Sequence, residues 1–215
     1  MITVYGVYGS PFVRKVVVAL EDKQIPYQLE PIIPMGVSPE YKKIHPLGKI
    51  PAIKDGDLTL PDSSAICAYL DKKQPSPLLY PTAIGDFGRA LWFEEYSDTA
   101  LAQVIGGKIF FPKVIAPKFM NKPCDEAAVQ KAVDEDLPPL FNYLEEQLGS
   151  KKFLVGDQFS IADLGVGSQM VNLVYSGVKV SEAKWPKLAA YFSSAILQRP
   201  SFKKVMSEEE KAFKA

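Results

Sequence analysis

One hydroxyl in this sequence stands where a helix is expected to begin. In the segment YGSPFVRK, Ser10 follows an apolar stretch and precedes Pro11, a residue suited to the first position of a helix. The free amides and the dipole of a helix N-terminus favour an anion beside them. A serine hydroxyl there can donate a charge-assisted hydrogen bond to a thiolate or an alkoxide. The alternative is that Ser10 only caps the helix.

A second candidate segment, HPLGKIPAI, places Pro51 at the start of an expected strand. Proline lacks an amide hydrogen and is confined to strand starts and edges. A cis Ile50–Pro51 bond would turn the backbone of Ile50 outward, where an extended peptide ligand can pair with it as an added strand. Lys49 beside it offers a cation to a carboxylate. The alternative is an ordinary extended loop with a solvated lysine.

The third segment, PDSSAI, offers one carboxylate and two hydroxyls at a second expected helix start. Asp62 can take a ligand ammonium group, while Ser63 and its amide can take a carboxylate. The alternative is simple helix capping. Each segment is a weak signal alone, and their order and spacing carry the interpretation.

These segments are expected to lie in a small mixed sheet covered by helices. ITVYGVY and QIPYQLEPII have the composition of strands, and FVRKVVVALEDKQ between them has no turn signal, which favours a helix. AIK and LTL flank Asp55-Gly56, a dipeptide preferred in two-residue hairpin turns. DSSAICAYLDKK follows as a helix. The order strand, helix, strand, hairpin, helix is typical of an α/β layer.

The rest of the chain is expected to be helical. QPSPLLYP contains three prolines and indicates a linker, and from Gly85 onward apolar residues recur with helical spacing. Pro138-Pro139 is expected to bend or interrupt one helix, and Gly106-Gly107 to kink another. Ser160 and Asp163 have the spacing of a capping box.

Composition limits the classes of partner. The 25 basic and 25 acidic residues cancel and no basic run interleaves with aromatic residues, so neither nucleic acid nor a membrane is an expected partner. MITVYGVYGS lacks a basic leader, and VVVAL is too short to span a bilayer. Cys67 and Cys124 stand in unrelated contexts, and one histidine with two scattered cysteines does not suit zinc. A reducing, cytoplasmic location without a metal is therefore expected.

Together these segments resemble the soluble (cytosolic) glutathione transferase family, in particular its serine-type phi, tau and theta classes. SPFVRKVVVAL resembles the serine-helix start of those classes, and HPLGKIP resembles an Asn-Pro-x-Gly-x-Ile-Pro segment with His45 in place of asparagine. LPDSSAICAYL resembles a Glu-Ser-x-Ala-Ile motif with Asp62 in place of glutamate. FLVGDQFSIADL and WPKLAAYFSSAILQRPSF resemble the capping-box segment and the C-terminal pattern of the family. The resemblance covers almost the whole chain.

The resemblance implies two domains. An α/β thioredoxin-like domain with a mixed four-stranded sheet is expected over residues 1–76, a linker over 77–87 and an all-α domain over 88–215. Glutathione is implied as the co-substrate, with no metal. The family forms dimers through contacts between the first domain of one subunit and the second domain of the other, so a homodimer is expected.

The resemblance also implies a role for each motif residue. Ser10 matches the hydroxyl that hydrogen-bonds the glutathione sulfur. Ile50, before the family's cis-proline, matches the residue whose backbone pairs with the cysteinyl moiety, and Lys49 matches a position that reaches the glycyl carboxylate. Asp62 and Ser63 match the pair that holds the γ-glutamyl group, although aspartate is one methylene shorter than glutamate. The expected glutathione-binding set is Phe12, Lys49, Ile50, Pro51, Asp62 and Ser63. His45 is expected only to shape its turn.

The family activates the thiol in two other ways. Tyrosine-type transferases use a tyrosine at the end of the first strand, which makes Tyr8 the second candidate after Ser10. Against the family pattern, Tyr5 and Tyr8 both fall out of register. Cysteine-type classes need a cysteine at this turn, and the sequence has none there.

The implied function is conjugation of the glutathione thiolate to a hydrophobic electrophile held by the helical domain. Three aromatic residues could line an apolar pocket for it: Tyr96, Phe110 and Phe111. The alternative is that these aromatic residues belong to the helix core. A glutathione-dependent peroxidase, isomerase or dehalogenase on the same scaffold is a second hypothesis. A non-catalytic relative that binds ligands or protein partners is a third.

Overall fold

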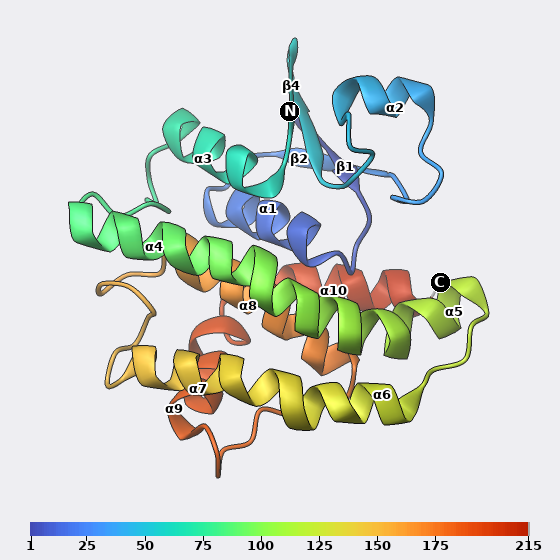
Figure 1. Ribbon diagram of the computed structural model, residues 1–215. Helices are drawn as coiled ribbons and strands as arrows, with labels where there is room; N and C mark the ends of the chain where they lie inside the picture. Colours follow the sequence, from blue (N-terminus) through green and yellow to red (C-terminus); the bar gives the residue numbers. More distant parts are fainter. Residues whose placement is uncertain (215) are drawn as a thin grey trace. The chain divides into compact units, whose positions relative to one another are not determined.

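The computed structural model describes residues 1–214 of the 215 (Figure 1). Two compact units make up the chain. The first contains Met1–Tyr80 together with the C-terminal segment from Pro200, and the second contains Pro81–Arg199. The first unit breaks after Tyr80, a residue within the expected linker 77–87, and the last helix groups with the first unit, whereas residues 88–215 were expected to form one domain.

The first unit is built on a four-stranded sheet. Its strands are β1 (Ile2–Gly6), β2 (Tyr27–Pro31), β3 (Ala52–Asp55) and β4 (Leu58–Pro61). The order across the sheet is β2-β1-β3-β4, with β1 and β2 parallel and the other pairs antiparallel. The predicted mixed sheet is confirmed.

The hairpin between β3 and β4 differs from its prediction by one residue. Asp55 pairs with Leu58, so the two turn residues are Gly56 and Asp57 and not Asp55 and Gly56. Gly56 has φ 61°, a conformation that glycine adopts without a steric penalty. Register decides the difference, since β3 is already aligned by pairing with β1 through Val4 and Ile53.

Four helices belong to the first unit: α1 (Pro11–Asp22), α2 (Pro39–Ile44), α3 (Ser63–Lys73) and α10 (Pro200–Lys214). The valines of α1 favour a strand by propensity, but burial of Val13, Val16 and Val17 on the helix outweighs that preference. Helix α10 packs on α1, and the two lie side by side in Figure 1. Phe202 and Val205 of α10 are buried, which explains why this helix groups with the first unit.

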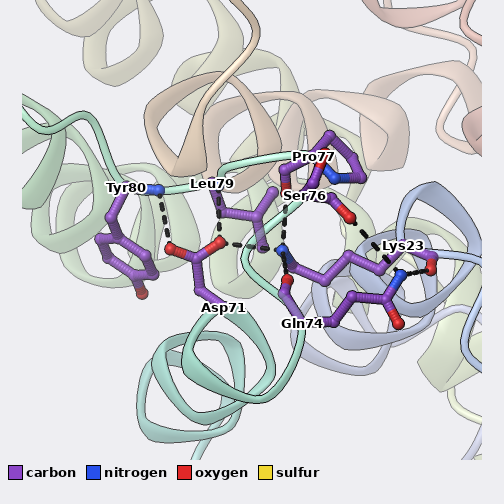
Figure 2. A network of polar contacts seen from close by, with 7 residues as sticks. All are labelled: Lys23, Asp71, Gln74, Ser76, Pro77, Leu79 and Tyr80. Atoms are coloured by element: carbon purple, nitrogen blue, oxygen red, sulfur yellow. Dashed lines mark hydrogen bonds and ion pairs between the residues drawn. The ribbon is translucent and has the colours of Figure 1, made fainter.

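A polar network lies at the C-terminal end of α1 (Figure 2). The Lys23 ammonium group is fully buried and donates to Asp71 Oδ1 at 2.8 Å, to Gln74 O at 2.7 Å and to Pro77 O at 2.6 Å. Asp71 also accepts from the Leu79 amide at 2.8 Å. The network therefore ties the end of α1 to α3 and to the segment that follows α3.

The second unit is helical. Its elements are α4 (Ile84–Tyr96), η1 (Ser97–Ile115), α5 (Ala116–Met120), α6 (Glu126–Lys131), η2 (Ala132–Asp136), α7 (Leu137–Leu148), α8 (Ile161–Tyr175), α9 (Pro186–Tyr191) and η3 (Phe192–Ile196). The η segments have π-helical hydrogen bonding, and the Gly106-Gly107 pair lies in the middle of η1. Helix α7 begins at Leu137, immediately before Pro138-Pro139, but the backbone stays helical from α6 through η2 into α7, so the proline pair does not interrupt the helix. The pair stands in the first turn of α7, where proline is tolerated.

Helix α8 is the core of the second unit. Every residue from Ile161 to Leu173 is buried, and the predicted capping box between Ser160 and Asp163 is present. Burial raises the pKa of the Asp163 carboxyl, although hydrogen bonds from the Leu154 amide, the Ser160 amide and Tyr191 favour its ionised form. Asp163 therefore joins three segments of this unit.

The continuous helix from Ile84 to Met120 is long and apolar enough to cross a membrane by length and composition alone. Core helices of soluble proteins can have the same composition. Leu101, Ile105 and Ile109 are fully buried at helical spacing, and the helix packs against α8. This packing accounts for the apolar residues on that face.

Candidate functional site

Sheet pairing brings the three candidate segments to one edge of the first unit. Tyr5 of β1 pairs with Ala52 of β3, and Ala52 pairs with Pro61 of β4. The C-terminal ends of β1 and β4 and the N-terminal end of β3 therefore lie side by side. The three segments leave the sheet from there. The Asp62 amide donates to Pro51 O at 3.3 Å, which joins the second and third segments directly.

Ser10 is the N-cap of α1, as predicted. Its backbone is extended, with φ −72° and ψ 124°, and its Oγ accepts from the Val13 amide at 3.4 Å. That long bond uses a lone pair of the hydroxyl and leaves its O–H without an acceptor among residues 1–214. The first turn of α1 carries no acidic residue that would offset the positive end of the helix dipole. Ser10 can therefore cap the helix and donate to an anion at the same time. Phe12 lies in that first turn and is partly exposed.

Tyr8, the second candidate, lies in a more acidic environment. Burial raises the pKa of its hydroxyl, and the charge of Glu208 raises it further, while a hydrogen bond with Tyr27 lowers it. Glu209 and Glu21 also raise this pKa. Carboxylates around a hydroxyl oppose an additional anion beside it.

The segment before β3 has the backbone form expected of it. The Ile50–Pro51 peptide bond is cis. The Tyr41 hydroxyl donates to Lys49 O at 2.7 Å and fixes the backbone at this point. The Lys49 side chain is exposed and Ile50 is partly exposed, so both can reach a ligand.

Asp62 and Ser63 begin α3. Asp62 Oδ1 accepts from the amides of Ser64 at 2.9 Å and Ala65 at 3.0 Å, while Oδ2 takes no hydrogen bond from the described residues. Asp62 has φ 76°, a strained conformation for a residue other than glycine, and such strain is concentrated at functional sites. Ser63 is only 3% exposed. Asp62 is exposed, so its second carboxylate oxygen is available to a ligand cation.

His45 lies next to this group of residues. Burial lowers the pKa of its imidazole, the charge of Asp62 raises it and that of Lys49 lowers it. The His45 amide donates to Tyr41 O at 2.8 Å, and its carbonyl accepts from the Gly48 amide at 2.8 Å. These backbone bonds agree with the expected role of His45 in shaping the turn.

Comparison with known proteins identifies the family. The model of the glutathione S-transferase N-terminal domain matches residues 4–78, and that of the C-terminal domain matches residues 110–209. The chain belongs to the glutathione S-transferase family. It is 31% identical over 208 residues to glutathione S-transferase 1 of Zea mays, covering 94% of each chain. It is also 31% identical to human glutathione S-transferase theta-1, over 83% of this chain and 75% of the relative.

The solved structures agree with this assignment. The structure of glutathione S-transferase-I bound with lactoylglutathione matches with a TM-score of 0.85 and 27% identity, over 96% of this chain and 98% of that one. The predicted family, transferase class and fold, a thioredoxin-like α/β part followed by a helical part, are therefore confirmed. The individual site residues and their roles stay predictions.

Two side chains in the glutathione S-transferase site region were not predicted. Lys15 of α1 is 1% exposed and donates to Ser64 Oγ at 2.9 Å, next to the start of α3. Glu209 of α10 accepts from the Gly9 amide at 3.2 Å, next to Ser10. A lysine within the apolar run of α1 was a possible signal for Lys15. Nothing in SEEEK distinguishes Glu209 from its two glutamate neighbours.

The three aromatic residues proposed for the electrophile lie in the second unit in different environments. Tyr96 is 9% exposed, packs on Tyr143 with ring centroids 5.1 Å apart and donates to Leu140 O at 3.2 Å. Burial raises the pKa of its hydroxyl to about 12. Phe110 is buried, and its ring centroid lies 6.4 Å from that of Tyr175, whereas Phe111 is 42% exposed. These environments favour the core interpretation for Tyr96 and Phe110.

Proposed function

We propose that this transferase conjugates glutathione to hydrophobic electrophiles, with the Ser10 hydroxyl donating a hydrogen bond to the glutathione thiolate. One observation carries the proposal: the O–H of Ser10 is not used by its capping bond, at a helix whose first turn contains no acidic residue. The test compares glutathione conjugation to an aryl halide by the native chain and by Ser10→Ala.

The required stabilisation is within reach of these groups. A free thiol has a pKa of about 8.5, and lowering it by about two units requires roughly 2.7 kcal/mol of preferential thiolate stabilisation. A hydrogen bond to a charged group contributes about 1.5–3 kcal/mol. A helix N-terminus adds about 0.3–1 kcal/mol, or more where it is partly buried. Ser10 and the start of α1 together can supply the required amount.

The acidic surroundings of Tyr8 support Ser10 as the donor. The carboxylates of Glu208 and Glu21, which raise the pKa of Tyr8, oppose a thiolate beside its hydroxyl, and Lys211 and Lys204 offset that charge only from exposed positions. Ser10 sits at the positive end of α1, where an anion is favoured. The balance of charge therefore favours Ser10.

The proposal assigns the rest of the tripeptide to the other two segments. The backbone of Ile50 pairs with the cysteinyl moiety, and the Lys49 ammonium group reaches the glycyl carboxylate. Asp62 Oδ2 binds the γ-glutamyl ammonium group, and Ser63 binds the γ-glutamyl carboxylate. Phe12 contacts the tripeptide from the first turn of α1. Among the aromatic residues of the second unit, we assign the electrophile contact to Phe111 because its ring is exposed.

The proposed role of Asp62 in binding glutathione can be separated from its role as a helix cap. Asp62→Asn keeps an oxygen that accepts from the Ser64 and Ala65 amides and tolerates the positive φ, but it loses the charge. We expect it to weaken glutathione binding by about ten- to a hundredfold, the value of a charge-assisted hydrogen bond. The measurement is a calorimetric titration of the variant with glutathione.

Asp62→Ala serves as the companion variant. It loses the same charge and also the cap, so it should bind glutathione as weakly as Asp62→Asn and be about 1 kcal/mol less stable. If Asp62→Asn binds glutathione as tightly as the native chain does, the γ-glutamyl assignment is wrong.

We also propose that the chain is a cytoplasmic homodimer, as is typical of the family. Helix α4 presents apolar side chains at helical spacing: Ile84 is 91% exposed, Phe87 is 42% exposed and Leu91 is 37% exposed. A second copy of the chain is the occupant that the family suggests for this face.

We expect Leu91→Glu to raise the dissociation constant of the dimer by about thirtyfold or more, because it places a charge in the apolar interface. Sedimentation at low concentration measures this change. Phe119→Glu is the matched control, since Phe119 is 55% exposed on α5 and outside this face. Equal dissociation constants for the native chain and Leu91→Glu would move the interface away from α4.

A further inference from the structure

The turn that carries Ser10 is held by the C-terminal helix. The amide of Gly9, the residue before Ser10, donates to Oε1 of Glu209 on α10 at 3.2 Å. The two residues are 200 positions apart in the sequence, and the bond is buried. Gly9 has φ 91°, a conformation that glycine adopts without a steric penalty, and it lies in a turn in which the Ser10 amide donates to Val7 O at 3.4 Å.

The Glu209 carboxylate is itself firmly placed. Arg14 of α1 donates from Nε to both of its oxygens at 2.9 Å, and both side chains are fully buried. The guanidinium group compensates the charge of the carboxylate, which would otherwise oppose an anion at the start of α1. Glu209 therefore meets the Gly9 amide as a fixed acceptor in a neutral pair.

A second residue of α10 approaches the same turn. A Cβ atom added to Gly9 would lie 2.6 Å from the Phe213 ring, so the absence of a side chain at Gly9 is what allows this approach. The turn is thus bounded on α10 by a hydrogen bond and by an aromatic ring. Both contacts act on the residue immediately before Ser10.

We propose that Glu209 is a positioning residue for thiol activation: its carboxylate holds the Gly9 amide and thereby fixes Ser10 at the start of α1. The inference rests on the proposed role of Ser10. A hydrogen-bond donor must be aimed at the position of the charge that it stabilises, and a misplacement of about 1 Å costs on the order of a hundredfold in rate.

A test must remove the acceptor without leaving a buried charge. Changing Glu209 alone would leave the buried Arg14 guanidinium group without its counter-charge, and such variants often fail to fold. Arg14→Met with Glu209→Met replaces the ion pair by apolar side chains of similar length and leaves the Gly9 amide without an acceptor. Arg14→Met with Glu209→Gln is equally uncharged and keeps a carbonyl oxygen that can accept from Gly9. The two double variants differ only at position 209.

The readouts are the pKa of glutathione bound to each variant, from the ultraviolet absorbance of its thiolate, and kcat and the KM for glutathione in its conjugation to an aryl halide. We expect the Met/Met variant to have a thiol pKa about one unit higher than the Met/Gln variant and a kcat about ten- to a hundredfold lower. The KM for glutathione should be similar, because the groups that bind the tripeptide are unchanged. In the Ser10→Ala background, the two double variants should have the same thiol pKa and the same kcat.

Each contrary result has a distinct meaning. Equal thiol pKa values for the Met/Met and Met/Gln variants with Ser10 present would overturn the positioning role of Glu209. An equal difference between them with and without Ser10 would also overturn it, since Glu209 would then act on the fold in general. If Ser10→Ala alone leaves the thiol pKa unchanged, the proposed activation by Ser10 fails, and the positioning role fails with it.

Discussion

Ser10→Ala is expected to lower the rate of glutathione conjugation by about 10- to 1000-fold while leaving glutathione affinity nearly unchanged. The hydroxyl donates to charge that is present on the thiolate and absent from the thiol, so its loss affects ionisation more than binding. The thiol pKa of bound glutathione should rise in the same variant. The measurements are kcat and the KM for glutathione in its conjugation to an aryl halide, with a spectroscopic titration of the bound thiol.

The chain offers a matched control for this substitution. Ser38 also caps a helix, also precedes a proline, and accepts from the Tyr41 amide at 3.2 Å. Ser38→Ala therefore removes the same kind of cap in the same unit, and we expect it to leave the thiol pKa unchanged. A native conjugation rate in Ser10→Ala would transfer the role to Tyr8 or to a backbone amide.

Asp71→Ala is expected to destabilise the first unit by about 3–5 kcal/mol, because it leaves the buried Lys23 ammonium group without its counter-charge. The Lys23 side chain is fully buried, and the Asp71 side chain is 7% exposed. The substitution also removes the acceptor of the Leu79 amide (Figure 2). Urea denaturation followed by circular dichroism measures the loss as a lower transition midpoint.

Two further variants separate charge from packing. Lys23→Met with Asp71→Asn removes both charges and keeps an oxygen that can accept from the Leu79 amide, so its destabilisation should be smaller than that of Asp71→Ala. Lys72→Ala, at an exposed position of the same helix, should change the free energy of unfolding by less than about 0.5 kcal/mol. A loss below about 1 kcal/mol in Asp71→Ala would show that the ion pair contributes little net stability.

The helix starts at Ser10, Asp62 and Ser160 could be predicted from the sequence. At each of these positions a hydrogen bond joins the residue to a group two or three residues away in the chain. Such interactions depend only on local spacing. The same locality made the strands and the hairpin recognisable, and the order of the motifs then indicated the family.

The candidate site could be predicted only as separate segments. That these segments meet follows from the pairing of β1 with β3 and of β3 with β4, which also placed the hairpin turn one residue later than its dipeptide indicated. The roles of Ser10, Asp62 and Lys49 toward glutathione stay predictions until they are measured.

The sequence by itself determined the strands, several of the helices, the caps at Ser10, Asp62 and Ser160, and the family of this protein. Only the tertiary structure decided that α10 belongs to the first unit, that Lys23 pairs with Asp71 across 48 positions and that Glu209 reaches Gly9 across 200. The physical reason is that the partner of a buried polar group depends on which elements pack against it. Residues near that group in the sequence carry no information about this packing.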